Sequence, residues 1–256
     1  MQNAALEALG RPERYCRLHV PAGEIGEAVP LLQAAGFLGV NLTIPHKTDV
    51  LPFLTGQDDH ARKLGAVNTV AFRGPHIIGR NTDGPGILRA IAEDLQVDPA
   101  TQRTLILGAG GGAGRAIATQ FSLLGSPGLI LLNRTYEKAA TLARALGATA
   151  IPWSEEALAD SLPQIDLIIN ASSVGMKHDD PSPIPVHFLT NRHLIYDTVY
   201  VGSETPLQRA ASAAGARSAN GVSLLLHQGA LSLEFWLGQP APLDIMRQAL
   251  HAARKS

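Results

Sequence analysis

Short apolar runs alternate with amphipathic stretches along the whole chain, and this alternation is typical of an α/β protein. Glycine and proline interrupt the pattern where elements are expected to end. In the first part of the chain, the spacing predicts a helix over 23–35, a strand over 39–44, a hairpin made of 66–72 and 76–79, and a helix over 85–95.

A second block, from residue 104 on, repeats the order strand, helix, strand. Because strands that are covered on both faces are apolar throughout, this repetition predicts a doubly wound parallel sheet. The expected elements are a strand from 104 that runs into a glycine-rich turn, a helix to about 124, strands 129–133, 150–153, 166–171, 193–199 and 216–219, and helices 136–146 and 205–214.

The chain ends in two predicted helices, 221–236 and 242–254, which have no strand partners of their own. We therefore expect these helices to pack on the first block. The sequence predicts two domains: an N-terminal α/β domain, 1–83 with 220–256, and a Rossmann-like doubly wound domain, 84–219.

The charges of the chain nearly cancel, with 21 Lys and Arg against 22 Asp and Glu, and hydrophobic residues make up 45% of it. This composition excludes a disordered chain and argues against a nucleic-acid partner, which normally requires a basic excess. No apolar run approaches the length of a membrane span. Small-molecule partners and a cytoplasmic location are expected, with the single cysteine, Cys16, and Trp236 packed in the interior.

A glycine-rich turn follows the first strand of the second block and opens a helix. It consists of Gly108, Ala109, Gly110, Gly111, Gly112 and Ala113, of which the first, third and last fit the pattern G-x-G-x-x-A. Such a turn lets the backbone approach a pyrophosphate, and the helix N-terminus favours its negative charge. The context predicts a dinucleotide site, with purely structural glycines as the alternative.

The end of the next strand distinguishes between the two nicotinamide cofactors. NAD sites normally place Asp or Glu there, whereas this chain has Asn133, Arg134 and Thr135, followed by Lys138. A guanidinium and an ammonium can hold a 2′-phosphate, which a carboxylate would repel. The sequence therefore predicts NADP, with a solvated helix start as the alternative interpretation.

Polar residues recur at the expected strand ends of the first block. Because strands tolerate Asn and Asp poorly, their repeated occurrence there suggests a functional role. They include Thr43, Asn68 and Asp83, and Lys47 follows shortly after Thr43. Side chains of this kind suggest a cleft in which Lys47 and Asp83 form a cation–carboxylate pair that can handle a proton. The residue types alone leave turn-capping amides and a surface lysine as the alternative.

Nine motifs of this chain stand in the order found in one enzyme family. They are GFLGVNLTIPHK (36–47), GAVNTV (65–70), GRNTDG (79–84), LGAGGGAGRA (107–116), NRT (133–135), NASSVGM (170–176), DTVY (197–200), ETPL (204–207) and NGVSLLLHQGA (220–230). As a set they resemble shikimate dehydrogenase over nearly the whole chain.

The resemblance implies the NADPH-dependent, reversible reduction of 3-dehydroshikimate to shikimate in chorismate and aromatic amino-acid biosynthesis. It implies that Lys47 donates a proton to the carbonyl oxygen and that Asp83 orients Lys47 and holds a ring hydroxyl. It further implies Thr43, Asn68, Tyr200 and Gln228 as substrate ligands, Val199 and Gly221 in the nicotinamide pocket, and the glycine turn with Asn133, Arg134, Thr135 and Lys138 as NADP contacts.

The N-terminus departs from the family pattern. The family begins with a strand and a Ser-x-Ser-Pro motif whose serines hold the substrate carboxylate, but residues 1–6 resemble the interior of the following helix. Two interpretations are a start assigned too far downstream and a truncated paralogue with impaired turnover. In addition, the glycine turn is one residue longer than usual.

Alternative functions are a quinate/shikimate dehydrogenase and an NADP-binding protein with impaired turnover. The nine histidines show no metal-ligand spacing, so no metal is expected. The resemblance leaves a homodimer open.

Overall fold

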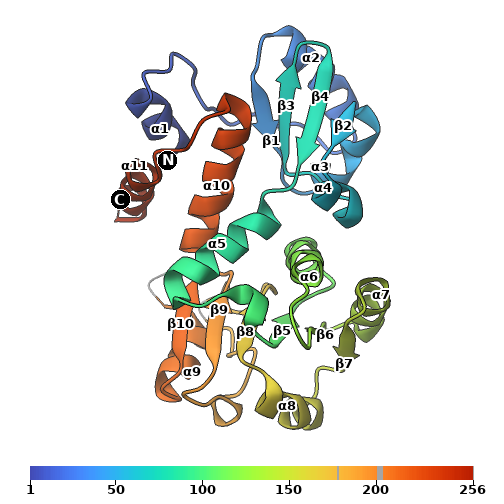
Figure 1. Cartoon of the computed structure of the whole chain (residues 1–256), viewed down its shortest axis with the longest axis vertical. Coiled ribbons are helices and arrows are strands. Elements are labelled where there is room, and N and C mark those ends of the chain that lie inside the picture. Colours follow the sequence, from blue (N-terminus) through green and yellow to red (C-terminus); the bar gives the residue numbers. More distant parts are fainter. Residues whose placement is uncertain (178, 201–203, 256) are drawn as a thin grey trace. The chain divides into compact units, whose positions relative to one another are not determined.

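The computed structural model describes residues 1–177, 179–200 and 204–255, and it forms two compact units (Figure 1). The first unit comprises Met1–Gly86 and Leu225–Ser256, and the second comprises Ile87–Leu224. The chain passes into the second unit within helix α5 (Asp83–Leu95) and leaves it within helix α10 (Val222–Leu237). Both units combine helices with a sheet, as the alternating pattern predicts.

A four-stranded sheet of order β1–β3–β4–β2 forms the centre of the first unit. The strands β3 and β4 form the predicted hairpin, and β1 pairs antiparallel with β3, so that Asn41 lies opposite Thr69. This register brings the polar ends of β1 and β3 together. The strand bounds are β1 (Gly39–Asn41), β2 (Gly56–Gln57), β3 (Thr69–Arg73) and β4 (His76–Arg80).

Helices cover both faces of this sheet. Successive residues of β3 point to opposite faces, and each face packs with a different set of helices. Ala71 packs with α1, α10 and α11, whereas Val70 and Phe72 pack with the helices of residues 25–64. The C-terminal helices therefore pack on the first unit, as predicted. The remaining helices of the unit are α1 (Gln2–Ala8), α2 (Ile25–Ala34), α3 (His46–Asp49), α4 (Asp59–Leu64) and α11 (Leu243–Lys255).

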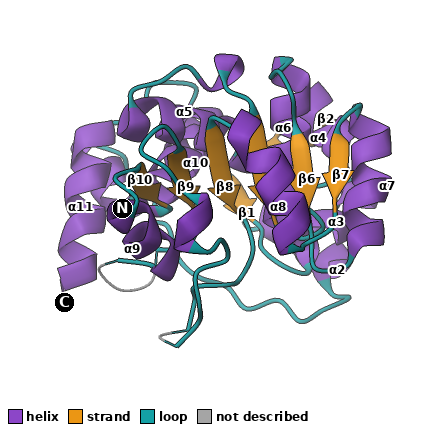
Figure 2. Ribbon diagram, turned by 90° about the horizontal axis from the view of Figure 1, so that it is seen from below, coloured by secondary structure: helices purple, strands orange, loops and turns teal. Residues whose placement is uncertain are grey.

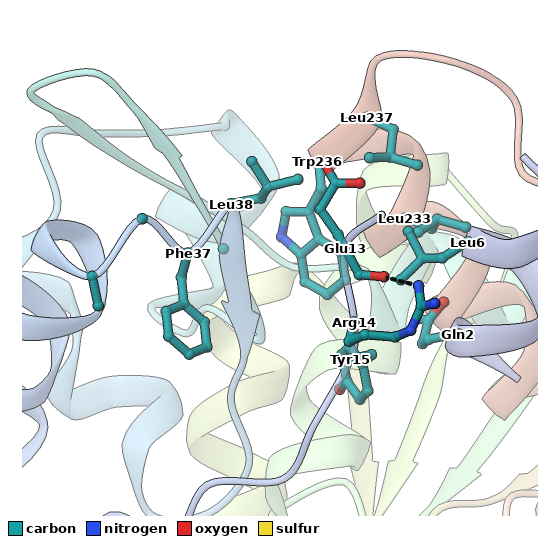
Figure 3. A pocket seen from close by; sticks show the side chains of 13 residues that line it. Gln2, Leu6, Glu13, Arg14, Tyr15, Phe37, Leu38, Leu233, Trp236 and Leu237 are labelled. Carbon is teal, nitrogen blue, oxygen red and sulfur yellow. Dashed lines mark hydrogen bonds between the residues drawn. The ribbon is translucent and has the colours of Figure 1, made fainter. Parts of the chain in front are cut away.

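Trp236 anchors the end of α10 to the sheet. Its indole Nε1 donates a hydrogen bond to the carbonyl oxygen of Val70 at 2.9 Å, and the ring is buried, as the sequence predicts. An open cavity of about 280 Å³ lies beside the ring, with Leu6 and Leu233 in its wall (Figure 3). The described wall of this cavity contains none of the polar residues predicted for the functional site.

The second unit contains a six-stranded parallel sheet of order β10–β9–β8–β5–β6–β7 (Figure 2). Its strands are β5 (Thr104–Leu107), β6 (Ile130–Leu132), β7 (Thr149–Ile151), β8 (Leu167–Asn170), β9 (Leu194–Asp197) and β10 (Arg217–Asn220). Its helices, apart from the parts of α5 and α10, are α6 (Gly112–Leu124), α7 (Tyr136–Leu146), α8 (Glu155–Ser161) and α9 (Pro206–Ala213).

Strand β5 shows why these strands are apolar throughout. Ile106 packs in one core with Phe121 of α6, whereas Leu105 packs in another core with Leu158 of α8 and Leu207 of α9. Because each face of the sheet is covered by helices, both sets of alternating side chains are buried. The predicted doubly wound sheet is confirmed.

The structure departs from the predictions mainly at strand ends and in short helices. The strand expected over 39–44 ends at Asn41, because the chain turns and the N–H of His46 donates to the carbonyl oxygen of Thr43 at 2.8 Å. Helices α3, α4 and α8 were not predicted, since they are too short to show a helical period. The expectation for Cys16 is wrong, because its side chain is exposed. Within the described residues, no helix is both long and apolar enough to cross a bilayer.

His193 is a buried histidine whose protonation should affect stability. Its Nδ1 accepts a hydrogen bond from the N–H of Thr190 at 3.0 Å, which leaves Nε2 to donate to the carbonyl oxygen of Leu162 at 3.2 Å. Burial lowers the pKa of His193 below its usual value. The folded chain therefore binds this proton more weakly than the unfolded chain does.

The stability contributed by neutral His193 is present above the unfolded pKa of about 6.5 and is lost as the pH falls below it. We expect the difference in unfolding free energy between the wild type and His193→Asn to shrink between about pH 7.5 and about pH 5.5 in urea titrations. His187→Asn, at an exposed position, is the control for replacing a histidine by asparagine. A difference that stays constant with pH would contradict this assignment.

Candidate active site

Lys47 and Asp83 form an ion pair in the first unit. The ammonium Nζ of Lys47 lies 2.6 Å from Oδ2 of Asp83, and the side chains are 27% and 22% exposed. Lys47 belongs to the short helix α3, whose position is fixed by a hydrogen bond from the N–H of Val67 to the Lys47 carbonyl oxygen. Asp83 begins α5. The pair predicted from the sequence is therefore made, and it remains accessible to a small molecule.

The side chain of Asn68 holds the second oxygen of Asp83. Its Nδ2 donates to Oδ1 of Asp83 at 2.8 Å and to the Thr82 hydroxyl at 3.0 Å, while its Oδ1 accepts from the N–H of Thr82 at 2.8 Å. Asn68 is buried, so these bonds exchange little with water. Each oxygen of the Asp83 carboxylate thus has one partner, and the carboxylate has a defined orientation.

A serine that the sequence analysis missed extends this network to α10. The Ser232 hydroxyl is fully buried and lies 2.8 Å from the Thr69 hydroxyl, 3.0 Å from Nδ2 of Asn41 and 2.9 Å from the carbonyl oxygen of Gln228. The hydroxyl of Thr69 in turn donates to Oδ1 of Asn68 at 2.9 Å. The only sequence signal is that Ser232 stands one helical turn after Gln228.

Thr43 and Gln228 stand on segments adjacent to those that carry the pair. Thr43 is exposed in the turn that leads into α3. Gln228 is half-buried on α10, and a Cβ placed on Gly86 would lie 3.0 Å from its Cβ, so Gln228 packs against the first turn of the helix that begins with Asp83. The structure therefore brings Lys47, Asn68 and Asp83 into contact, and it packs Gln228 against the start of α5. For Thr43 it shows only that the preceding residue, Leu42, donates its N–H to the carbonyl oxygen of Asn68 at 2.8 Å.

The glycine-rich turn connects β5 to α6 in the second unit. Gly108 has a φ of 77°, and a Cβ there would lie 2.7 Å from the backbone of Ser172. A Cβ on Gly114 would lie 2.2 Å from the carbonyl oxygen of Gly108, whereas one on Gly112 would meet open space. The close helix–strand approach thus falls on Gly114, one residue later than G-x-G-x-x-A predicts, and Ala113 is exposed.

The residues after β6 complete this site. Asn133 accepts a hydrogen bond from the N–H of Gly110 at 3.1 Å, which joins the two strand ends. An open groove of about 510 Å³ runs beside them, lined by the turn together with Arg134, Thr135 and Lys138. Among its described lining residues are these two cations and no carboxylate. At α6, no described side chain caps the helix start. Free N–H groups, cations and open space fit a phosphorylated dinucleotide.

Val199, Tyr200 and Gly221 lie together at the carboxyl ends of β9 and β10. The N–H of Gly221 faces the carbonyl oxygen of Val199 at 3.4 Å, and a Cβ on Gly221 would lie 2.1 Å from the carbonyl oxygen of Thr198. Glycine is therefore required for this approach. Val199 is buried, and Tyr200 is 46% exposed.

Three family models match successive parts of the chain. They are described as the shikimate dehydrogenase substrate binding domain (residues 1–70), shikimate/quinate 5-dehydrogenase (90–177) and the shikimate 5′-dehydrogenase C-terminal domain (221–251). The NADP⁺-dependent shikimate dehydrogenase of Symbiobacterium thermophilum is 41% identical over 99% of this chain and 88% of its own. That of Desulforamulus reducens is 37% identical over 98% and 89%. The chain belongs to the shikimate dehydrogenase family.

Solved structures of the family support the same assignment. Shikimate 5-dehydrogenase from Thermus thermophilus, in complex with NADP(H) and shikimate, has a TM-score of 0.87 at 32% identity and covers 98% of this chain and 92% of its own. A quinate dehydrogenase from Corynebacterium glutamicum in complex with NAD has a TM-score of 0.89 at 27% identity, covering 98% and 92%. Proteins of this fold thus differ in substrate and in bound cofactor. The preference of this chain depends on the side chains in its own site.

The glycine turn offers a matched pair of substitutions. Gly114→Ala forces the start of α6 away from β5, because its Cβ would overlap the Gly108 carbonyl oxygen. We expect it to lower the melting temperature by several degrees, since overpacking costs about 1–3 kcal/mol. Gly112→Ala, whose Cβ meets open space, should leave the melting temperature of the free protein nearly unchanged. Equal melting temperatures for the two variants in a thermal scan would contradict the close approach at Gly114.

Proposed function

We propose that this protein catalyses the reversible, NADP-dependent oxidation of shikimate to 3-dehydroshikimate, a step of chorismate and aromatic amino-acid biosynthesis. The observation that carries the proposal is the Lys47–Asp83 pair, held at 2.6 Å and oriented by Asn68. Membership of the NADP-dependent shikimate dehydrogenase family supplies the substrate class.

In the reducing direction, Lys47 would donate a proton to the carbonyl oxygen of 3-dehydroshikimate. In the oxidising direction it would take that proton from the hydroxyl of shikimate. When bound, NADPH supplies the hydride. Asp83 would orient the ammonium of Lys47 and accept a hydrogen bond from a ring hydroxyl. A positioned acid–base pair typically raises the rate of such a proton transfer by roughly 10²- to 10⁴-fold.

We propose Thr43, Gln228 and Tyr200 as contacts of the substrate hydroxyl groups. Asn68 belongs with them, but both hydrogens of its amide are donated to Thr82 and Asp83, so it acts chiefly by holding Asp83. The substrate domain would then consist of residues 1–83 with 220–256.

We propose that residues 84–219 form the NADP domain. The glycine turn would hold the pyrophosphate through the open N-terminus of α6. Arg134 and Lys138, with Asn133 and Thr135, would hold the 2′-phosphate, because charge-assisted hydrogen bonds favour an anion there. Val199 and Gly221 would line the nicotinamide pocket.

A quinate/shikimate dehydrogenase is the second candidate, favoured by the structural likeness to a quinate dehydrogenase. That protein is in complex with NAD, whereas the groove of this chain has two cations and no carboxylate among its described lining residues. The side chains therefore favour NADP.

The nearly balanced charge favours small molecules over nucleic acid or a membrane as partners, and we propose a cytoplasmic location. Light scattering would distinguish a monomer from a homodimer.

The proposed function is tested by shikimate-dependent reduction of NADP, followed by absorbance, with quinate and NAD as comparators. We expect the highest kcat/KM for shikimate with NADP. A higher kcat/KM for quinate would favour the second candidate. NADP binding without turnover of either substrate would favour a binding protein.

Asp83→Asn removes the charge that orients Lys47. We expect kcat for shikimate to fall by about 10²- to 10⁴-fold, since the acid–base pair is lost. Calorimetry should show an unchanged Kd for NADP, because the residues proposed to hold its pyrophosphate and 2′-phosphate belong to the second unit, whereas Asp83 belongs to the first. Asp59→Asn, at an exposed carboxylate of α4, is the control and should retain wild-type kcat. An Asp83→Asn enzyme with wild-type kcat would exclude this carboxylate from the mechanism.

A further inference from the structure

Asp197, the last residue of β9, is a fully buried carboxylate that the proposed reaction does not use. Within the described residues, no cation pairs with it. Its Oδ1 accepts hydrogen bonds from Nδ2 of Asn170 at 2.9 Å and from the N–H of Val199 at 3.1 Å, and its Oδ2 accepts from the Thr205 hydroxyl at 2.6 Å. Burial raises the pKa of Asp197, and these three hydrogen bonds oppose the rise.

Two of the three donors flank the connection between β9 and α9. Val199 stands two residues after Asp197, and Thr205 is the N-cap of α9, whose hydroxyl also accepts from the N–H of Gln208 at 3.2 Å. A single carboxylate therefore holds the beginning and the end of this connection. Tyr200 follows Val199 directly, so the place of its backbone depends on the same bond.

The third donor joins Asp197 to the glycine turn. Oδ1 of Asn170 accepts hydrogen bonds from the N–H and the hydroxyl of Ser172, at 3.1 Å and 2.7 Å. Ser172 packs so closely on Gly108 that a Cβ there would lie 2.7 Å away. The network thus links the carboxyl ends of β5, β8 and β9. An isolated buried carboxylate is costly, so its presence at this junction calls for a role.

We propose that Asp197 is a positioning residue for the reaction: by holding Val199 and Thr205 it places Val199 against the nicotinamide and Tyr200 against the substrate. This inference rests on the proposed function. It assigns no contact between Asp197 and either ligand, because the carboxylate is fully buried and its oxygens are occupied by protein donors.

The test compares Asp197→Ala, which removes all three bonds, with Asp197→Asn, which keeps an acceptor for Asn170 and Val199. Asp166→Asn is the matched control. The Asp166 carboxylate also accepts a hydrogen bond from a backbone N–H, that of Arg103 at 3.0 Å, but Asp166 precedes β8 and therefore lies at the amino end of that strand. Three quantities are measured: kcat/KM for shikimate, the Kd of adenosine 2′,5′-bisphosphate, and hydrogen exchange at the amide of Val199. The bisphosphate reports on the Arg134 end of the NADP site and carries no nicotinamide.

A misplacement of about 1 Å can cost about a hundredfold in rate, so we expect Asp197→Ala to lower kcat/KM by about ten- to a hundredfold. The Kd of the bisphosphate should stay within about twofold, and exchange at Val199 should accelerate. Asp197→Asn should recover a large part of the loss, and Asp166→Asn should match the wild type. A kcat/KM within about twofold of wild type in Asp197→Ala would overturn the proposal, as would an equal loss of bisphosphate affinity, which indicates a general structural role.

If Asp197→Ala does not fold, two substitutions of Thr205 test the proposal instead. Thr205→Val removes the hydroxyl donor at nearly constant volume, and Thr205→Ser keeps it. The proposal expects about a tenfold lower kcat/KM in the first and near wild-type values in the second, because only the first loses the charge-assisted hydrogen bond from the Thr205 hydroxyl to Asp197. Equal activity of the two variants would count against the proposal, and so would failure of Thr205→Val to fold.

Failure of the proposed function is recognised separately. A wild-type chain that does not oxidise shikimate refutes the proposed function, whereas the placement of Val199 is then judged by hydrogen exchange and by the nicotinamide fluorescence of bound NADPH. Unchanged exchange and fluorescence in Asp197→Ala would refute the positioning role whatever the substrate is.

Discussion

The side-chain amide of Asn68 is the interaction on which the candidate active site depends. It donates to the Asp83 carboxylate and the Thr82 hydroxyl, and its oxygen accepts from the Thr82 backbone. A buried amide with its donors and acceptor engaged has one stable orientation, because any other would leave a polar group unpaired at a cost of about 1–3 kcal/mol. Asp83 is thereby fixed to the residue that precedes β3, and Lys47 is fixed to Asp83.

The same principle organises the second unit at the ends of its parallel strands. There Asn170 and Asp197 join the loops that follow β8 and β9, as Asn68 joins β3 to α5. In both places a short polar side chain is buried and hydrogen-bonded to protein groups. It holds neighbouring residues that we propose to contact substrate or cofactor. In the second unit, Gly108, Gly114 and Gly221 permit close backbone approaches near these hydrogen-bonded side chains.

The sequence predicts the architecture well where periodicity is long or boundaries are marked. The helix expected over 136–146 is found at those residues because Gly147, at a φ of 67°, ends it. The contact between Lys47 and Asp83 follows from residue types and the family resemblance. Ser232 could not be predicted, since its spacing of one helical turn from Gln228 does not show that Asn41 and Thr69 are its partners. Asp197 could not be recognised either, because a carboxylate at a strand end looks solvated until its burial is known.

A double-mutant cycle on kcat/KM for shikimate, with Asn68→Ala, Asp83→Asn and the combination, tests the central claim most directly. If Asn68 acts through Asp83, Asn68→Ala should lower kcat/KM strongly in the wild type and by no more than about threefold when Asp83 is already replaced. Losses that add in full would mean that Asn68 acts independently of Asp83, and they would contradict the account.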